Sequence, residues 1–373
     1  MLGFVIHIIR VFAPRSTEII DCKTPRSIGT STIAPMRTLA LLFLLATMVS
    51  AQMAEFISEK MPTPSCHAST IVELSNGDLL ASWFGGAKEG APDVAIWRSR
   101  RTSSGWSMPR EAAREPDVAA YNPVLFHSAD GVLWFYYKFG KSPETWSAAR
   151  EYSRDEGATW SAVEHLPAGL YGPIRAKPLV LSNGIILSGT SVESYGTWAC
   201  WIERSTDNGR AWTRIGPIAA SLSLAANPPQ RGRPHGIIQP SLVDLGGHHI
   251  RLYARSTNNI GRICQSDSLD DGLTWSKVKT IALPNPNSGI DAVRLRDGRL
   301  VMVYNHTTSG RTPLNLAVSA TGEHWHNFYD LETHPGEYSY PALIQARNGD
   351  LLMTYTWNRM KIRFVRFPLE KVP

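Results

Sequence analysis

Charge and cysteine are scarce in this chain of 373 residues, and each scarcity excludes a class of function. Only 19% of the residues are charged, and no block of lysine and arginine stands out. The sequence therefore lacks the basic patch with which proteins bind nucleic acids. The four cysteines are widely spaced, which leaves no disulfide framework and no CxxC zinc site. Single arginines still suffice to bind a small acidic molecule.

The signature motifs of several large enzyme classes are also missing. The sequence has no GxSxG elbow, no GxGxxG or GxxxxGK[ST] phosphate loop, no HExxH motif and no EF-hand loop, which argues against the chemistries that use them. His248, His249, His324 and His334 lack the spacing of metal ligands. We therefore expect no cofactor and no bound metal.

One long apolar run lies near the N-terminus. Met36 and Arg37 lead into TLALLFLLATMV, and Ser50 and Ala51 follow, which is typical of a secretory signal cleaved after Ala51. We expect residues 1–51 to be a leader and signal peptide, with translation starting at Met36, and the mature protein to be secreted or periplasmic. The run is too short to span a membrane. A second apolar anchor is the alternative.

Three short turns repeat almost unchanged along the chain. They read SRDEGATW from Ser153, STDNGRAW from Ser205 and SLDDGLTW from Ser268, and degenerate copies occur at residues 319–325 and around Gly105. The Ser and Asp side chains can accept backbone N–H bonds across the turn, the Gly can take a positive φ, and the Trp can cover the turn. Each turn therefore predicts the same local structure.

A second repeat, of strand, glycine turn and strand, interleaves with the first. Its turn glycines are spaced 54, 53, 63, 51 and 51 residues apart: Gly77, Gly131, Gly184, Gly247, Gly298 and Gly349. Six hairpins with about fifty residues per unit predict an all-β fold, a six-bladed β-propeller over residues 52–373. A β-sandwich is the alternative, but it gives no reason for this period. AEFISE near residue 54 and IRFVRF at 362–367 are expected to pair and close the ring.

These residues resemble the Asp-box or BNR-repeat sialidases, six-bladed propellers that remove terminal sialic acid. The three turns match the Asp box closely, and the resemblance extends over nearly all of residues 52–373. It implies a site at the propeller axis, where the innermost strands begin. That site would hold an arginine cluster for the sugar carboxylate, a protonated acid for the leaving oxygen, and a Tyr nucleophile polarised by a Glu.

Several positions fit the resemblance. Arg255 and Arg311 match the second and third clamp arginines in placement, and Asp93, on the glycine-flanked loop GGAKEGAPD, matches the acid. Tyr338 matches the nucleophile, with Glu337 beside it, and Tyr340 fits almost as well in register.

Two positions depart from the family pattern. His67 in CHAS stands where the family has its first clamp arginine, and Gln239 in IIQPS stands where it has the Glu that polarises the Tyr. Arg175, Lys177 and Glu193 are candidates to compensate, with Arg175 as a further substrate-binding residue.

Three functions remain open from the sequence. The first is an exported sialidase-like exo-glycosidase that acts on a terminal acidic sugar, with an acidic oligosaccharide or glycoconjugate as its partner, no nucleic acid, and no membrane after signal cleavage. The second is a polysaccharide lyase, in which His67 and a tyrosine move the proton next to a uronate. The third is a glycan-binding propeller without chemistry. A glycosylation sequon begins at Asn305 and matters only in a host that glycosylates.

Overall fold

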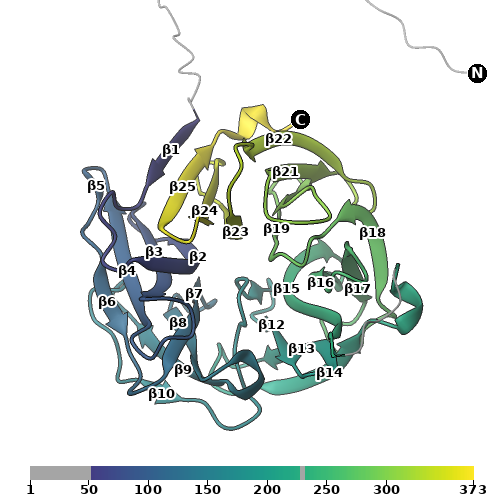
Figure 1. Ribbon diagram of the computed structural model, residues 1–373, viewed down its shortest axis with the longest axis horizontal. Helices are drawn as coiled ribbons and strands as arrows, with labels where there is room; N and C mark the ends of the chain where they lie inside the picture. The colour runs from purple at the N-terminus through teal and green to yellow at the C-terminus, as the bar shows by residue number, and fades with distance from the viewer. Residues whose placement is uncertain (1–51, 227–231) are drawn as a thin grey trace, which may run out of the picture. The chain divides into compact units, whose positions relative to one another are not determined.

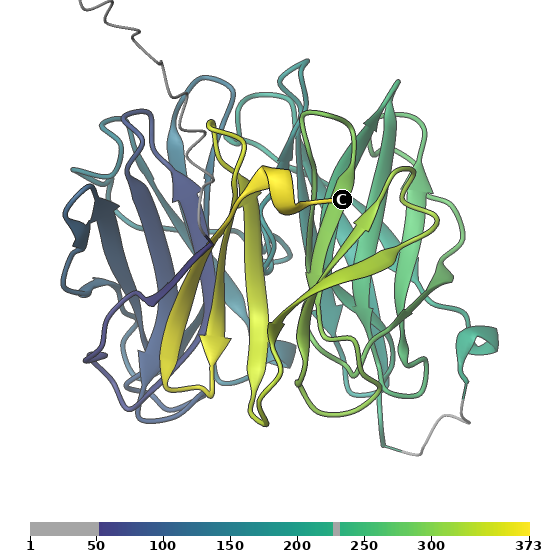
Figure 2. The same ribbon diagram turned by 90° about the horizontal axis from the view of Figure 1, so that it is seen from above.

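The computed structural model describes residues 52–226 and 232–373, which consist almost entirely of β-strands. The sheets follow one another in chain order around a common axis (Figure 1). Their strands run between two faces that carry the turns (Figure 2). The leader expected at residues 1–51 lies outside the described residues. No helix in the described ranges is long and apolar enough to cross a membrane.

The strands of three sheets follow each other directly in sequence. The first sheet holds β2 (Ser65–Glu73), β3 (Leu79–Gly86), β4 (Ala95–Thr102), β5 (Gly105–Trp106) and β6 (Arg110–Ala113). The next holds β7 (Ala119–His127), β8 (Leu133–Gly140), β9 (Ser147–Ser153) and β10 (Glu164–His165). A third holds β19 (Asp291–Arg294), β20 (Leu300–Tyr304), β21 (Leu314–Ser319) and β22 (His326–Glu332).

Between the second and third of these lies an eight-stranded sheet made of two antiparallel groups. One group is β11 (Leu179–Val180), β12 (Ile186–Glu193), β13 (Thr197–Ser205) and β14 (Thr213–Ala219). The other is β15 (His235–Gly246), β16 (His249–Ser256), β17 (Arg262–Ser268) and β18 (Lys279–Pro284). Among the described strands, the two groups are paired only by a parallel contact of two residue pairs between β13 and β15. Single-turn 3₁₀ helices complete the described elements: η1 (Pro143–Thr145), η2 (Leu222–Leu224) and η3 (Leu369–Lys371).

The last sheet joins the two ends of the described chain. It has the order β1 (Met53–Phe56), β25 (Lys361–Phe367), β24 (Leu351–Trp357) and β23 (Tyr338–Gln345). β1 pairs antiparallel with β25, from Met53 opposite Arg366 to Phe56 opposite Arg363. The pairing expected from the sequence is therefore confirmed: β25 lies between β24 and β1, and β1 has β25 as its strand partner.

The strands β2, β7, β15, β19 and β23 lie nearest the axis (Figure 1), and together with β11 they are the first strands of the predicted hairpins. Each leads into a glycine turn, as at Gly77 (φ 89°) and Gly349 (φ 101°), where a side chain would be strained. The hydrophobic core lies between neighbouring sheets. Trp83 of β3 and Phe364 of β25, for example, belong to one buried cluster. Burying such a side chain contributes about 1.5–3 kcal/mol.

The Asp-box turns form the local structure that their residues predict. Ser153 donates its hydroxyl proton to Asp155 Oδ1 (2.7 Å) and accepts the N–H of Gly157 (2.7 Å). Asp155 Oδ1 in turn accepts the N–H of Thr159 (2.8 Å), and the Trp160 indole N–H donates to Gly157 O (3.2 Å). Each such turn connects the third strand of its group to the fourth, away from the axis.

Arginines fasten these turns to the preceding group of strands. Arg150 on β9 donates to Gly209 O (2.6 Å), and Arg204 on β13 donates to Asp271 O (3.2 Å). Arg100 on β4 likewise donates to Glu156 O. In all three cases an arginine on a third strand binds a backbone carbonyl of the next Asp-box turn. The repeat thus supplies both the turn and the acceptor that connects adjacent sheets.

Candidate active site

Four innermost strands carry a bulge at the same level. The pairing register shifts in β2, β7, β15 and β23, and each bulge contains one residue with left-handed backbone. These residues are Ala68 (φ 54°), Asn122 (φ 40°), Gln239 (φ 56°) and Tyr340 (φ 49°). A left-handed conformation costs a residue other than glycine about 1–2 kcal/mol. Repeated strain at one level of a fold indicates a functional requirement there.

Tyr340 lies at the centre of the polar cluster that these strands form. Its hydroxyl oxygen accepts hydrogen bonds from Gln239 Nε2 (3.1 Å) and Arg255 Nη1 (2.9 Å). Gln239 Oε1 accepts a second bond from Arg255 Nη1 (3.1 Å). The ring of His67 meets the tyrosine ring edge-on, with centroids 4.3 Å apart. Gln239, in the position where the family has a Glu, is thus a donor to the phenolic oxygen.

Three arginines surround the Tyr340 ring. The guanidinium carbons of Arg175, Arg255 and Arg311 lie 5.4, 5.9 and 5.5 Å from its centroid, within the range of cation–π attraction. Burial lowers the pKa of Arg175 and of Arg311. Arg175 is 3% exposed, and its Nε and Nη1 atoms have no hydrogen-bond partner in the described structure. Buried cations with free donors favour an anionic ligand.

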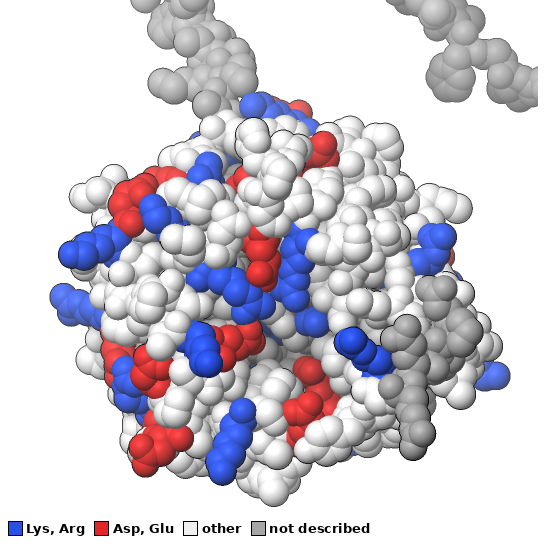
Figure 3. Space-filling view, in the orientation of Figure 1, with Lys and Arg blue, Asp and Glu red and all other residues white. Residues whose placement is uncertain are grey.

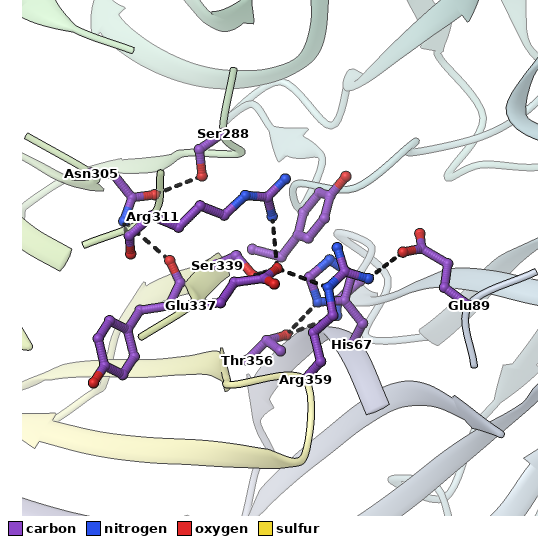
Figure 4. Close-up of polar contacts among 12 residues, drawn as sticks. His67, Glu89, Ser288, Asn305, Arg311, Glu337, Ser339, Thr356 and Arg359 are labelled. Atoms are coloured by element: carbon purple, nitrogen blue, oxygen red, sulfur yellow. Dashed lines mark hydrogen bonds and ion pairs between the residues drawn. The ribbon is translucent and has the colours of Figure 1, made fainter. Parts of the chain in front are cut away.

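A fourth arginine, Arg359, enters from the turn between β24 and β25. Its Nε donates to Glu337 Oε1 (2.8 Å), and its Nη1 bonds to Glu89 (Figure 4). Glu337 also lies 3.5 Å from Arg311 Nη1, so one carboxylate connects two arginines. The space-filling view shows basic and acidic side chains gathered around a hollow at the centre of this face (Figure 3).

His67 is a neutral imidazole in this setting. Burial, together with the charges of Arg359, Arg311 and other arginines, holds its pKa well below the usual range. Its Nδ1 atom is 3.0 Å from Thr356 Oγ1, and its buried Nε2 atom has no partner within the described residues. A neutral histidine cannot replace an arginine as a carboxylate clamp, but it can accept a proton.

Glu193, at the end of β12, is a carboxyl group with an unusual proton affinity. Burial raises its pKa to about 7, against an opposing effect of Arg255. It pairs across the sheet with Trp198, whose ring lies 5.8 Å from the Arg255 guanidinium carbon. A carboxyl that is half protonated near neutral pH suits general acid–base catalysis.

Two expected residues lie elsewhere. Tyr338 is 2% exposed in the hydrophobic cluster between the last two sheets, because the bulge after Ser339 gives it a different direction from Tyr340. Asp93 is exposed and accepts the N–H of Ala87 (2.9 Å), which closes its own loop. Glu89 is the carboxylate of that loop that reaches the arginine cluster. The structure therefore shows no side-chain contact of Tyr338 or Asp93 with the arginine cluster around Tyr340 within the described residues.

Three further residues of the site, Arg359, Glu89 and Asn287, stand in no motif of the sequence. Asn287 Oδ1 accepts a hydrogen bond from Arg255 Nε (2.6 Å) and so orients that guanidinium. Arg359 follows Asn358 in a turn in which both residues are left-handed without being glycine (φ 55° and 51°). No pattern in the sequence marked that turn.

Lys177 binds the buried Asp291 (3.0 Å) and is therefore a structural cation.

Asn305 connects the backbone segments that carry the site. Its Nδ2 donates to the carbonyls of Arg311 (2.9 Å), Pro313 (2.9 Å) and Tyr338 (3.1 Å). Its Oδ1 accepts the hydroxyl of Ser288 (2.6 Å), as Figure 4 shows. The side chain is fully buried, so the sequon at Asn305 offers no glycosylation acceptor in the folded protein.

Radially arranged antiparallel sheets around an arginine-rich centre define a protein of the sialidase-like β-propeller class. More specifically, residues 77–353 match the family described as BNR repeat-like domain, and the chain belongs to that family. The resemblance inferred from the Asp boxes is confirmed. A comparison with curated proteins finds no match.

Several solved structures are similar to the chain. The NanB sialidase of Streptococcus pneumoniae has a TM-score of 0.67 at 14% identity, over 86% of this chain and 71% of that one. The intramolecular trans-sialidase of Ruminococcus gnavus has a TM-score of 0.66 at 13% identity, over 85% and 97%. A Dyadobacter fermentans protein of unknown function has a TM-score of 0.68 at 15% identity, over 84% and 97%. At these identities the likeness establishes the fold, and function must be argued from the site.

Proposed function

We propose that this protein is an exported exo-glycosidase that hydrolyses a terminal acidic sugar, sialic acid or a related uronic acid, from a glycan. The observation that supports this most is the convergence of Arg175, Arg255 and Arg311 on Tyr340. Arginine binds carboxylates through two parallel N–H bonds, and burial strengthens those bonds. Arg311 already has Glu337 3.5 Å from its Nη1 atom, but a neutral sugar would leave the buried Arg175, whose Nε and Nη1 atoms lack partners in the described structure, without an anion.

Tyr340 is the proposed nucleophile, in place of Tyr338. A carboxylate nucleophile would be repelled by a substrate whose own carboxylate sits on the reacting carbon, whereas a tyrosine is not. Gln239 and Arg255 both donate to the tyrosine oxygen. They would stabilise the negative charge that develops there as the proton passes to a base, for which the neutral His67 beside the Tyr340 ring is the candidate.

Glu193 is the proposed proton donor to the leaving oxygen, in place of Asp93. With a pKa raised to about 7 by burial, it retains a proton near neutral pH. Glu337 accepts a hydrogen bond from Arg359 Nε (2.8 Å) and lies 3.5 Å from Arg311 Nη1, so its carboxylate is engaged by two arginines. We assign Glu337 to orienting these arginines.

The proposal includes a ring of six blades. It is obtained by dividing the eight-stranded sheet at the two-residue contact of β13 and β15, so that each group of four strands is one blade. Residues 52–373 then form one propeller domain behind a leader and signal peptide at 1–51, and the mature protein is secreted or periplasmic. Its partner is an acidic oligosaccharide or glycoconjugate.

The test is turnover of a panel of aryl sialosides and aryl uronosides by the purified protein and by Arg311→Ala. Loss of one carboxylate-binding arginine should reduce kcat/KM about 100-fold or more, since a charge-assisted contact contributes about 1.5–3 kcal/mol and further transition-state interactions depend on it. Arg110→Ala, at an exposed position on β6, is the matched control and should retain activity. Full activity of Arg311→Ala on the best substrate would refute the clamp.

A polysaccharide lyase is the second candidate, favoured by one observation. His67 is neutral, has a free buried Nε2 atom, and contacts Tyr340 through its ring edge. It could therefore remove the proton next to a uronate carboxylate while the arginines stabilise the resulting charge. A lyase forms an unsaturated uronate that absorbs in the near ultraviolet, and a hydrolase does not. Binding of acidic glycans with neither product would indicate a binding protein without chemistry.

A further inference from the structure

We infer that Arg359, in the last sheet, is a carboxylate-binding arginine of this site. It takes the place of the clamp arginine that is missing from the first sheet, where His67 stands at that position. The inference rests on the proposed acidic-sugar substrate and names the residue that selects for the acid. Arg359 lies in the turn between β24 and β25, outside every motif that identified the other arginines.

Arg359 is next to His67 in space although 292 positions separate them in the chain. The N–H of Cys66 donates to the backbone oxygen of Arg359 (2.8 Å), which joins the start of β2 to this turn. Thr356, three residues before Arg359, bonds to the ring of His67 (3.0 Å). Arg359 also contributes the largest of the four arginine charges that lower the pKa of His67. The positive charge missing at position 67 is therefore present beside it.

The side chain of Arg359 is oriented toward a second arginine of the cluster. Glu337 Oε1 accepts a hydrogen bond from Arg359 Nε (2.8 Å) and lies 3.5 Å from Arg311 Nη1 (Figure 4). Arg311 and Arg359 are thus close enough for one carboxylate to contact both. Glu337 holds the two guanidinium groups at this spacing.

Arg359 has a second carboxylate partner that is easily exchanged. Its Nη1 bonds to Glu89, which is exposed and belongs to the loop between β3 and β4. A surface ion pair of this kind contributes about 0–1 kcal/mol. A substrate carboxylate held by several arginines at once can therefore replace Glu89 at little cost in free energy.

The backbone of the turn supports a role for the side chain. Asn358 and Arg359 both have left-handed φ angles (51° and 55°), which glycine would adopt without strain. The left-handed backbone of Arg359 therefore costs conformational energy that a glycine would not cost. A glycine, however, would have no guanidinium group to place in the arginine cluster.

The assignment predicts that Arg359 discriminates between an acid and its neutral ester. The experiment measures the affinity of the purified full chain for N-acetylneuraminic acid and its methyl ester, and for glucuronic acid and its methyl ester, by calorimetry. The wild type should prefer one of the acids to its ester. Arg359→Gln, which keeps hydrogen-bonding capacity toward Glu337 but no charge, should bind that acid about 10- to 100-fold more weakly and the ester unchanged. Arg110→Gln is the control and should behave as the wild type.

Circular dichroism and thermal unfolding establish whether Arg359→Gln is folded. If it is not, Arg359→Lys gives the same comparison, because lysine keeps the charge but loses the two-point contact; it should lose about 10-fold for the acid alone. Equal weakening of acid and ester, or no weakening of either, would overturn the assignment, as would a wild type without preference for the acid. Binding does not depend on turnover. An acid preference that Arg359→Gln abolishes, in a protein without glycosidase activity, would leave this inference standing and remove the proposed hydrolysis.

Discussion

Replacement of Asn305 by alanine should reveal how strongly one buried amide organises the site. The Nδ2 atom donates to three backbone carbonyls at 2.9, 2.9 and 3.1 Å, and the side chain is 0% exposed. Alanine leaves these acceptors and the Ser288 hydroxyl without their partner in a region closed to water. A buried polar group without its partner costs about 1–3 kcal/mol. Because several such groups lose their partner at once and are only partly buried, the substitution should lower the free energy of unfolding by about 2–4 kcal/mol.

The measurement is urea or thermal unfolding of the variant beside Asn76→Ala. Asn76 makes comparable amide contacts, but in the exposed glycine turn between β2 and β3. The buried substitution should lower Tm by roughly 4–12 °C, and the exposed one by much less. Because Asn305 bonds to the backbone of Arg311, the folded variant should also show a raised KM for the acidic sugar that the proposed function requires. Equal effects of the two substitutions would refute the organising role of Asn305.

Three further predictions concern the proposed chemistry and the Asp box. Tyr340→Phe should abolish turnover and Tyr338→Phe should retain it, as assayed with the same aryl glycoside; the reverse result would restore the assignment to Tyr338. Since burial raises the pKa of Glu193 to about 7 and only its protonated form can donate, kcat/KM should fall above about pH 7. Glu193→Gln should be inactive throughout the pH profile, and a flat wild-type profile would contradict the role. The Thr159 hydroxyl and N–H, with other hydrogen bonds, lower the pKa of Asp155 from 3.8 to about 2. Its ionised form therefore stabilises the fold above about pH 4, and this contribution is lost as the pH falls toward about 2. Asp155→Asn should show a smaller acid-induced loss of stability in urea unfolding than the wild type, and an unchanged pH dependence would argue against the turn.

Periodic features of the sequence predicted the all-β fold, its hairpins and its closure. The glycine turns and Asp boxes use local interactions, so their residues determine their structure wherever they occur. The pairing of β1 with β25 was also predictable, because a ring leaves no other strand for either end. Arg255 and Arg311 could be located relative to these repeats, and the structure brings both to Tyr340.

The details of the site depend on departures from regular strands. The repeat pattern of the sequence does not reveal where these departures occur. In a regular strand Tyr338 and Tyr340 would share a face, but the bulge in β23 places only Tyr340 among the arginines. Asp93 lies on the glycine-flanked loop that the resemblance indicates, and there its carboxylate accepts the N–H of Ala87. Arg359 acts across the junction of the chain ends, and such a contact exists only once the ring has formed.

The hydrogen bonds between arginines and Asp-box turns bear on the order in which the sheets can assemble. Arg100, Arg150 and Arg204 each precede in the chain the turn that they bind. A ribosome that delivers the chain from its N-terminus therefore always produces the donor before the acceptor, so each new sheet can dock on one that already exists. The contacts of the first sheet with the last can form only late, since β1 pairs with β25 and the N–H of Cys66 bonds to Arg359 O. This order favours stepwise docking of the sheets along the polypeptide, with the joining of the two chain ends as the last step.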